Sequence, residues 1–162
     1  MPDVFTKTKR SDVMSRIRSR GNKDTELALA KVFRAEGITG WRRHLKLKAG
    51  ALRVERSNAR SSQHSTQTLS QLIVRPDFVF PNLRLAVFVD GCFWHGCPLH
   101  ATEPKGNAAF WRRKFATNKA RDRLVTRTLR RNGWRVLRIW EHELKKPALV
   151  IAKVRKALAP AL

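Results

Sequence analysis

Two aspartates at the ends of apolar runs are the first candidates for chemistry in this chain. Asp77 follows Pro76 at the start of one apolar run, and Asp90 ends the next. If the two runs form adjacent strands, the carboxylates lie close together and offer the hard oxygen ligands that hold Mg²⁺ beside a substrate phosphate. An ion there would activate water for phosphodiester cleavage. The alternative is that Asp77 caps a turn and Asp90 accepts hydrogen bonds from loop amides.

A second candidate is the segment DGCFWHGCPLH. Its Cys92, Cys97 and His100 offer three soft or borderline metal ligands within nine residues, and a tetrahedral structural zinc needs a fourth. His142 is the best candidate for the fourth ligand, because it follows a predicted strand whose end can reach the loop. His95 competes for that position. The alternative is a pair of buried free thiols with histidines at the surface.

His95 is the candidate general base. It lies five residues after Asp90, so a loop that folds back can place the imidazole over a metal-bound water. A neutral imidazole near physiological pH is suited to proton abstraction. Asp122 can orient the ring, as a carboxylate orients histidine in other hydrolases. The alternative for Asp122 is a local ion pair with Arg121 or Arg123, its neighbours in the sequence.

The balance of charge predicts a polyanionic partner. Lys and Arg number 35 against 12 Asp and Glu, which gives a net charge of +23. Such a charge repels itself in the compact state. Nucleic acid would relieve the repulsion, and counterion release would add affinity at low salt. Ribosomal-type packaging, membrane adhesion and solubility tuning are the alternatives.

Aromatic rings accompany this charge. Phe93 and Trp94 are adjacent between two predicted zinc ligands, and Trp111 lies in a basic segment. Rings on a metal-pinned loop beside a basic surface can wedge between base pairs, whereas the alternative is ordinary core packing. Basic residues suited to phosphate contacts surround Trp111: Arg112, Arg113, Lys114 and Lys119.

Composition argues against membrane insertion and export. No run approaches the roughly 18 consecutive apolar residues of a membrane span, and the N-terminus lacks an apolar signal core. We therefore expect a cytoplasmic protein associated with the bacterial nucleoid. In that compartment, the spacing of Cys92 and Cys97 favours a metal site over a disulfide.

The elements that position these residues fit one domain over residues 1–162. A short basic helix is predicted within residues 11–22, with Met14 and Ile17 on one face. Residues 48–74 are polar and rich in Ser, Arg and Gln, with neither a helical nor a strand period. We interpret this segment as an inserted, flexible loop.

The remaining elements predict an α/β fold in which helices flank a mixed sheet. The run AVFV is apolar on both faces, as a central strand should be. In chain order we expect a helix that starts after Asp24 or Thr25 and ends at Gly37, an imperfect strand over Trp41–Leu47, a hairpin of Asp77–Phe80 and Leu83–Asp90, a long basic helix over Ala108–Arg131, a strand over Trp134–Trp140, and a helix over Pro147–Leu158.

Together these motifs resemble the very short patch repair (Vsr) endonucleases. The resemblance spans nearly the whole chain except about residues 46–74, and the motifs occur in order. It rests on RSDVMSRIRSR…TE near the N-terminus, RPDFVF (75–80), GCFWH (91–95), FW…K…N…RD (110–122) and GWRVLRIWE (133–141).

This family implies a nuclease core of the PD-(D/E)xK type, a structural zinc and Mg²⁺-dependent nicking of one DNA strand. By resemblance, Asp77 is the principal metal ligand and Val89 offers its backbone carbonyl to Mg²⁺. His95 is the general base, Asp122 pairs with it, and Glu26 is the N-terminal carboxylate near the catalytic water. The implied DNA contacts are the intercalating rings Phe93, Trp94 and Trp111, Met14 and Ile17 in the opposite groove, and Lys114 and Asn118 at the mismatched pair.

Three features depart from the family pattern. The second strand ends in Asp90-Gly91-Cys92 rather than acid-x-lysine, and better known members have histidine where Asp90 stands, so Asp90 becomes a candidate extra metal ligand. The zinc set follows a different order of Cys and His: Cys92, Cys97, His100 and His142. Residues 46–74 lengthen the link into Asp77.

The resemblance therefore implies an endonuclease that nicks duplex DNA beside a T:G mismatch and so initiates repair of deaminated 5-methylcytosine. Mg²⁺ is the expected catalytic cofactor and Zn²⁺ the structural one. Expected partners are mismatched duplex DNA and other mismatch-repair proteins, with no membrane, and we expect a monomer. The alternatives are an endonuclease without mismatch preference and a zinc-containing DNA-binding module without catalysis.

Overall fold

The computed structural model describes residues 8, 25–53, 69–102, 104 and 106–159. Within these residues, helices and strands come both before and after the long helix α3 in the chain. In chain order they are α2 (Glu26–Ala35), β1 (Arg42–Arg43), β2 (Leu47–Arg53), β3 (Leu69–Val74), β4 (Phe78–Phe80), the 3₁₀ helix η1 (Pro81–Leu83), β5 (Leu85–Asp90), α3 (Ala108–Arg131), β6 (Arg135–Trp140), the 3₁₀ helix η2 (Glu141–Lys145) and α4 (Pro147–Leu158).

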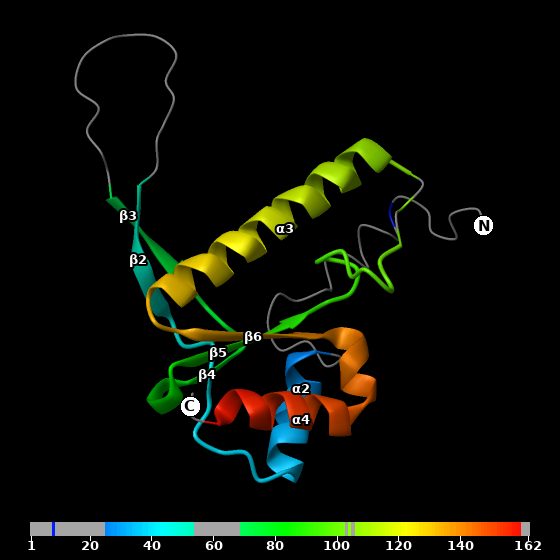
Figure 1. The fold of residues 1–162 in the computed structure, drawn as a ribbon. Coiled ribbons are helices and arrows are strands. Elements are labelled where there is room, and N and C mark those ends of the chain that lie inside the picture. Colours follow the sequence, from blue (N-terminus) through cyan, green and yellow to red (C-terminus); the bar gives the residue numbers. More distant parts are fainter. Residues whose placement is uncertain (1–7, 9–24, 54–68, 103, 105, 160–162) are drawn as a thin grey trace.

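A mixed sheet forms the centre of the fold. Its four strands lie in the order β1-β4-β5-β6. β4 and β5 are antiparallel, whereas β5 and β6 are parallel. α3 covers one face of this sheet, and α2 and α4 cover the other (Figure 1). The predicted α/β arrangement, a mixed sheet flanked by helices, is confirmed.

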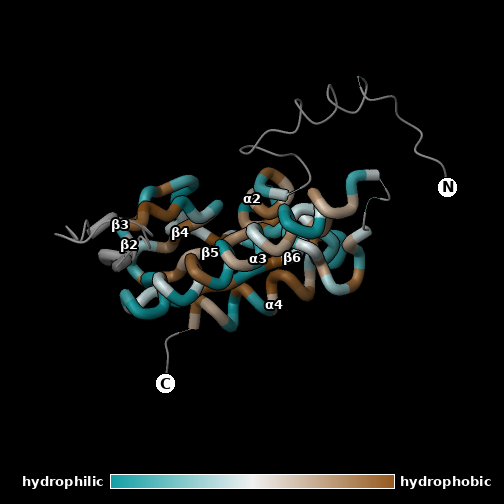
Figure 2. Tube along the Cα trace, turned by 90° about the horizontal axis from the view of Figure 1, so that it is seen from above, coloured by the Kyte–Doolittle hydropathy of each residue, from teal (hydrophilic) through white to brown (hydrophobic). Residues whose placement is uncertain are grey.

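Both faces of the central strands are buried, as the apolar run AVFV predicts. Phe78 and Val87 pack with Phe33 of α2 on one face. Val79 packs with Leu129 of α3 on the other. Figure 2, which views the fold from above, shows hydrophobic residues concentrated where the strands and helices meet. The two apolar layers hold α3 and the α2–α4 pair against a rigid sheet.

The parallel pairing of β5 and β6 determines where the candidate site lies. α3 connects the two strands, and Asp90 at the end of β5 is in register with Trp140 at the end of β6. The segments that follow the two strands therefore leave the sheet at the same edge. The cysteine-rich loop comes after β5 and η2 comes after β6, so residues 50 positions apart in the sequence become neighbours.

α2 begins and ends where the sequence predicts. Thr25 is its N-cap residue, although the Thr25 side chain makes no capping hydrogen bond. Glu26 occupies the first turn, where the positive end of the helix dipole favours a carboxylate. Gly37 follows the helix with φ of 63°, a left-handed conformation that glycine adopts without steric penalty.

The expected strand over residues 41–47 is wrong in its extent. Only Arg42 and Arg43 pair with β4, and Leu47 begins the separate strand β2. The interruption occurs at His44, which has a φ of 53°. A left-handed residue cannot continue a strand, because it turns the chain away from the extended direction.

The interpretation of residues 48–74 as a loop is also wrong at both ends of the segment. β2 and β3 form an antiparallel ribbon with an irregularity between Ala49 and Ala51. The ribbon projects beyond the main sheet (Figure 1), and of its residues Leu47 and Val74 are buried against the α3 side of the core. Because a projecting ribbon has little apolar area to bury, its sequence lacks the alternation that identifies a strand.

Several predictions concern residues outside the described ranges. These are the N-terminal helix within residues 11–22, with Met14 and Ile17, and the flexibility assigned to the middle of residues 48–74. None of the described helices combines the length and the apolar character needed to cross a bilayer.

Candidate active site

A pocket of about 820 Å³ opens at the sheet edge where β5 ends. Its walls come from α3, from the start of α2 and from the loop after β5. All five predicted catalytic residues line it: Glu26, Asp77, Asp90, His95 and Asp122. Four segments distant in sequence thus converge on one open cleft, and the Asp77 and His95 side chains share it.

Asp77 lies at the entrance to β4 and is tied to the next strand. Its Oδ2 accepts a hydrogen bond from the backbone N–H of Val89 at 2.7 Å. Burial, with smaller contributions from the nearby carboxylates of Glu26 and Asp90, raises the pKa of Asp77 to about 7 despite the opposing hydrogen bond from Val89. A bound cation would stabilise the ionised form of this buried carboxylate.

Glu26 meets Asp77 from the first turn of α2. It is buried, with 4% of its surface exposed. Its Oε2 lies 2.9 Å from Arg43 NH2 and 3.0 Å from His44 Nε2. One ligand atom each from Glu26, His44 and Asp77 lie within 4.8 Å of one another. These residues could hold a divalent cation with two oxygens and one nitrogen.

His44 is a residue next to Glu26 and Asp77 that the sequence did not reveal. The segment around it was interpreted as a strand, in which alternate side chains point to opposite faces. Its left-handed backbone removes it from that pattern. A histidine next to two arginines carries no spacing signal toward Glu26 or Asp77, so tertiary structure alone brings the three together.

His95 and Asp122 form a hydrogen-bonded pair across the pocket. His95 Nδ1 lies 2.7 Å from Asp122 Oδ2, and the side chains are 29% and 24% exposed. Burial opposes protonation of the ring, but the hydrogen bond to Asp122 and the charge of Asp90 outweigh it and raise the pKa of His95. The pair leaves the Nε2 atom of His95 as the ring nitrogen available to a substrate.

Asp122 is not paired with its sequence neighbours. Its Oδ1 lies 2.9 Å from Arg138 NH2 of β6. Burial alone would raise the pKa of Asp122, but the hydrogen bond from His95 and the charge of Arg138 lower it overall. Asp122 therefore remains ionised and holds the Nδ1 side of the imidazole.

Asp90 has a different environment from the one expected of an extra metal ligand. Arg138 donates to both of its oxygens, from Nε and from NH2, each at 2.6 Å. Asp90 is 4% exposed, so the pair is a buried bidentate ion pair. Its Oδ1 also lies 3.6 Å from His95 Nδ1. The structure thus places Asp90 beside the His95–Asp122 pair, with both oxygens already bound.

Arg138 is the second residue that the sequence analysis missed. Its guanidinium bridges Asp90 and Asp122 and lies over the Phe88 ring at 5.0 Å. A signal was present, since Arg138 is the cation in the middle of the otherwise apolar run VLRIW. A charge at that position of a buried strand requires a buried partner.

The predicted metal ligands of the loop also converge. The Sγ atom of Cys92 lies 3.2 Å from His142 Nδ1, and that of Cys97 lies 3.5 Å from the same atom and 3.8 Å from His100 Nδ1. Four donor atoms lie within 4.8 Å of one another. Tetrahedral zinc with two sulfur and two nitrogen ligands needs separations of about 3.5 Å. His95 points into the pocket instead, so His142 is the fourth member of this cluster.

Hydrogen bonds hold the loop in place. Cys97 N–H donates to the Cys92 carbonyl at 2.9 Å, and Cys92 N–H donates to Glu141 of η2 at 3.0 Å. Gly96 has a φ of 61°, and a Cβ there would lie 2.5 Å from Cε of Lys119. The left-handed backbone favours glycine at this position, whereas the end of the Lys119 side chain could shift to admit a Cβ.

The predicted intercalating rings form one aromatic cluster. Phe93 contacts Trp94 and Trp111 with ring centroids 5.1 Å apart in both pairs, and Phe115 at 5.4 Å. The rings meet edge to face and are partly buried. Asn118 donates from Nδ2 to the Trp94 carbonyl at 2.8 Å and so joins the cluster to α3. In this structure the rings pack on one another at the rim of the pocket.

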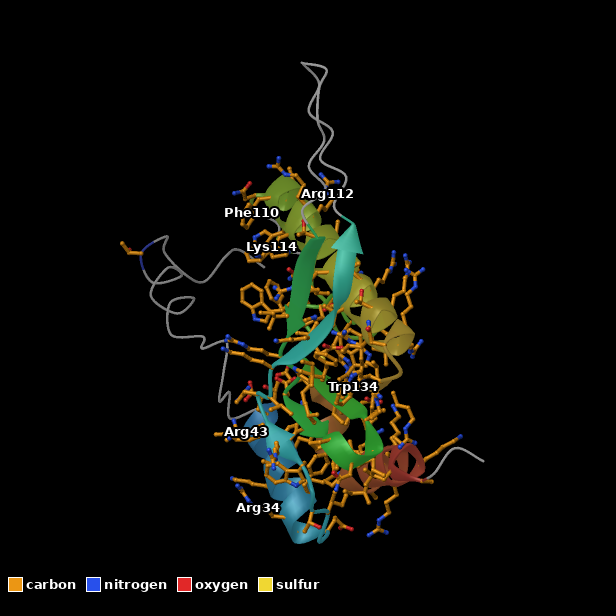
Figure 3. All side chains as sticks on the ribbon, turned by 90° about the vertical axis from the view of Figure 1, so that its left-hand side faces the viewer. Arg34, Arg43, Phe110, Arg112, Lys114 and Trp134 are labelled. Atoms are coloured by element: carbon orange, nitrogen blue, oxygen red, sulfur yellow. The ribbon has the colours of Figure 1, made fainter. Side chains whose placement is uncertain are left out.

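A basic surface adjoins the aromatic cluster. Arg112, Lys114 and Lys119 on α3 are exposed. Figure 3 shows Phe110, Arg112 and Lys114 together at the N-terminal end of α3, at the opposite end of the molecule from Arg34. Exposed cations therefore lie beside aromatic rings and a carboxylate-lined pocket. This arrangement suits nucleic-acid binding, because the cations can contact backbone phosphates near the pocket.

Comparison with known proteins points to one family. The family model for the DNA mismatch endonuclease Vsr matches residues 64–100. The chain is 53% identical over 70 residues to the type II nicking enzyme V.NaeI of Lentzea aerocolonigenes, across 43% of this chain and 42% of that protein. It is 42% identical over 73 residues to the DNA mismatch endonuclease Vsr of Escherichia coli K12, across 44% of this chain and 46% of that protein.

These two matches span less than half of each relative, but another extends further. The chain is 36% identical over 159 residues to the type II nicking enzyme V.NmeDIP of Neisseria meningitidis serogroup C, which covers 96% of this chain and 90% of that protein. The resemblance to Vsr noted in the sequence is confirmed, and the chain belongs to the Vsr endonuclease family.

Proposed function

We propose that this protein is a divalent-metal-dependent DNA endonuclease that nicks one strand of duplex DNA beside a T:G mismatch. The observation that carries the proposal is the shared pocket, in which Asp77 and Glu26 face a His95–Asp122 pair. Carboxylates for a cation on one side and a general base on the other are the parts that phosphodiester hydrolysis needs.

Asp77 and Glu26 would hold the cation, for which we propose Mg²⁺, with the backbone carbonyl of Val89 as a further ligand. Such an ion, when bound, polarises the phosphate and lowers the pKa of a water ligand. Asp122 accepts from Nδ1 of His95 and fixes the tautomer in which Nε2 is free. Nε2 then takes the proton of the attacking water, and Asp122 and Asp90 stabilise the imidazolium that results.

Arg138 holds this base in place. Because it binds both oxygens of Asp90 and one of Asp122, it fixes the Asp122 carboxylate in the orientation that His95 requires. A pre-positioned base needs no reorganisation when substrate binds.

We further propose that Cys92, Cys97, His100 and His142 hold a structural zinc. The chemistry of the donor set fits, since thiolate sulfur and imidazole nitrogen are the usual zinc ligands in closed sites. The loop between the two cysteines carries Phe93, Trp94 and His95. A metal at its base would keep the rings and the general base in a fixed relation.

On the DNA side, exposed cations of α3 bind phosphates, and Phe93, Trp94 and Trp111 insert between base pairs. Lys114 is exposed and free to reach the mismatched pair. Asn118 would have to release the Trp94 carbonyl before it could read a base. The opposite-groove contacts of Met14 and Ile17 remain predictions that lie outside the described residues.

The function is tested on closed circular plasmid and on duplexes that differ only in a T:G or C:G pair. We expect metal-dependent nicking of the T:G duplex, and a fall of about 10² to 10⁴-fold in the rate for His95→Ala. Glu26→Gln should also lose activity, whereas Glu36→Gln, at the other end of α2, should not. DNA binding without any metal-dependent nicking would instead identify a non-catalytic binding module.

A second candidate function is nicking without mismatch preference. The names of the relatives support it, because V.NaeI and V.NmeDIP are described as type II nicking enzymes rather than mismatch endonucleases. Equal rates on the T:G and C:G duplexes would favour this function and remove the repair role, while leaving the catalytic residues unchanged.

A further inference from the structure

His44 contacts the proposed cation ligands but has no part in the mechanism above. Its Nε2 lies 3.0 Å from Glu26 Oε2, with 27% of the side chain exposed. A ligand atom from His44, one from Glu26 and one from Asp77 all lie within 4.8 Å of one another. A single cation among them could contact all three donors.

The backbone at His44 holds the ring at this position. His44 has a φ of 53°, in the left-handed region that non-glycine residues rarely occupy. Its N–H donates to the Asp77 carbonyl at 3.3 Å, which links the turn directly to the first proposed ligand. An unfavourable conformation that surrounding structure maintains is often found at functional sites. Here the turn stops β1 and leaves the imidazole against Glu26.

Arg43 places a positive charge next to Glu26 and His44. Its NH2 lies 2.9 Å from Glu26 Oε2 and 3.3 Å from His44 Nε2. Within the part of the chain that the structure describes, Arg43 Nε is buried without a hydrogen-bond partner. The guanidinium is therefore incompletely bound, and its partly exposed side chain can move outward when a divalent cation takes its place.

We propose that His44 Nε2 is a direct ligand of the cation that Glu26 and Asp77 bind. The inference rests on the proposed function for the presence of a cation at Asp77. Mg²⁺ prefers oxygen ligands and retains several waters, whereas imidazole favours first-row transition ions. A nitrogen ligand therefore shifts the preference of this site from Mg²⁺ toward ions such as Mn²⁺.

Pulsed electron paramagnetic resonance of bound Mn²⁺ tests the ligand directly. Mn²⁺ is added to the zinc-containing protein, and coupling to a directly bound ¹⁴N nucleus is measured. We expect this coupling in the wild type and its loss in His44→Asn. Asparagine readily adopts the left-handed conformation, so the variant keeps the turn and removes the imidazole.

The matched control is His95→Asn, which removes the imidazole of the proposed general base and should retain the ¹⁴N coupling. Wild-type protein that binds Mn²⁺ without ¹⁴N coupling would overturn the proposal, as would coupling lost in His95→Asn and kept in His44→Asn. A wild-type protein that binds no Mn²⁺ would also overturn it.

Cation competition provides a second measurement. The ratio of Mn²⁺ to Mg²⁺ affinity, measured by calorimetry, should fall by about tenfold or more in His44→Asn, since even residues behind the ligands change metal affinity by about 10 to 100-fold. An unchanged ratio would contradict direct ligation. The two proposals fail separately: coupling without nicking refutes only the nuclease function, and nicking without coupling refutes only the role of His44.

Discussion

Replacement of Arg138 by methionine should affect both stability and catalysis. Arg138 donates to both oxygens of Asp90 at 2.6 Å and lies 2.9 Å from Asp122 Oδ1. Methionine retains much of the apolar stem over Phe88 but removes every donor. Asp90, with 4% of its surface exposed, is then a buried carboxylate without its cation.

The expected loss of stability follows from that burial. Removal of one partner from a buried ion pair costs about 3–5 kcal/mol, because the other charge is left uncompensated. The Arg138 side chain is 24% exposed, so solvent compensates part of the charge and we expect about 3 kcal/mol. For a chain of this size that corresponds to a fall in Tm of roughly 6–12 °C.

Catalysis should fall as well, because Asp122 loses one of its two partners and His95 loses its fixed orientation. Loss of a group that orients a catalytic ligand typically reduces activity by about 10 to 100-fold. The reduction should appear in kcat, with little change in KM, since Arg138 contacts no exposed phosphate-binding residue.

Thermal unfolding followed by circular dichroism and single-turnover nicking would measure both effects. Arg130→Met, at an exposed position of α3, is the control for loss of an arginine. The double variant Asp90→Leu/Arg138→Met should recover much of the stability, since apolar replacement of both partners of a buried pair is often neutral. The reasoning is refuted if Arg138→Met unfolds within about 1 kcal/mol of wild type at pH 7.

Three further predictions follow from the described geometry. Elemental analysis should find about one zinc per chain, and Cys97→Ser should lose it together with stability; a full equivalent of zinc in that variant would contradict the proposed ligand set. In metal-free protein, Asp77→Asn should stabilise the fold, more at pH 8 than at pH 5. Because the folded pKa of Asp77 is raised to about 7, the destabilisation caused by its carboxylate is absent below the unfolded pKa of about 4, grows as the pH rises from there to the folded pKa, and is fully present above it. An equal gain at both pH values, measured by urea unfolding, would show that the carboxylate is not penalised. Gly96→Ala should destabilise the loop by about 1 kcal/mol or more because of its positive φ, whereas Gly106→Ala, where a Cβ meets nothing within 4 Å, should have little effect on the unfolding midpoint.

The sequence predicted the elements whose period is clear. The hairpin that ends at Asp90 is a nearly continuous apolar run that is buried on both faces, which is the pattern that predicts such strands. The helix α3 was recognisable as a long segment without Gly or Pro that ends at Asn132-Gly133. The zinc-type cluster was also foreseeable, because three of its donors lie in one short loop and the fourth follows the adjacent parallel strand.

Other parts depended on tertiary contacts that no local pattern encodes. His44 lies against Glu26 because its own backbone is left-handed. The conformation of a single residue leaves no periodic pattern in the sequence. The partner of Asp90 lies 48 positions away on β6, so without strand register its ion pair could not be inferred. β2 and β3 form a ribbon outside the main sheet whose sequences, LKAGALR and LSQLIV, lack strict alternation of apolar and polar residues, so neither was identified as a strand.

The parallel ends of β5 and β6 support both of the proposed metal sites. β5 continues into the loop that carries Cys92 and His95, while β6 supplies Arg138 and leads into His142. A chelator that removes the proposed zinc would therefore release both the loop and the base without binding in the cleft. Inactivation by such a chelator should proceed at the rate of zinc release, and added Mg²⁺ should not reverse it.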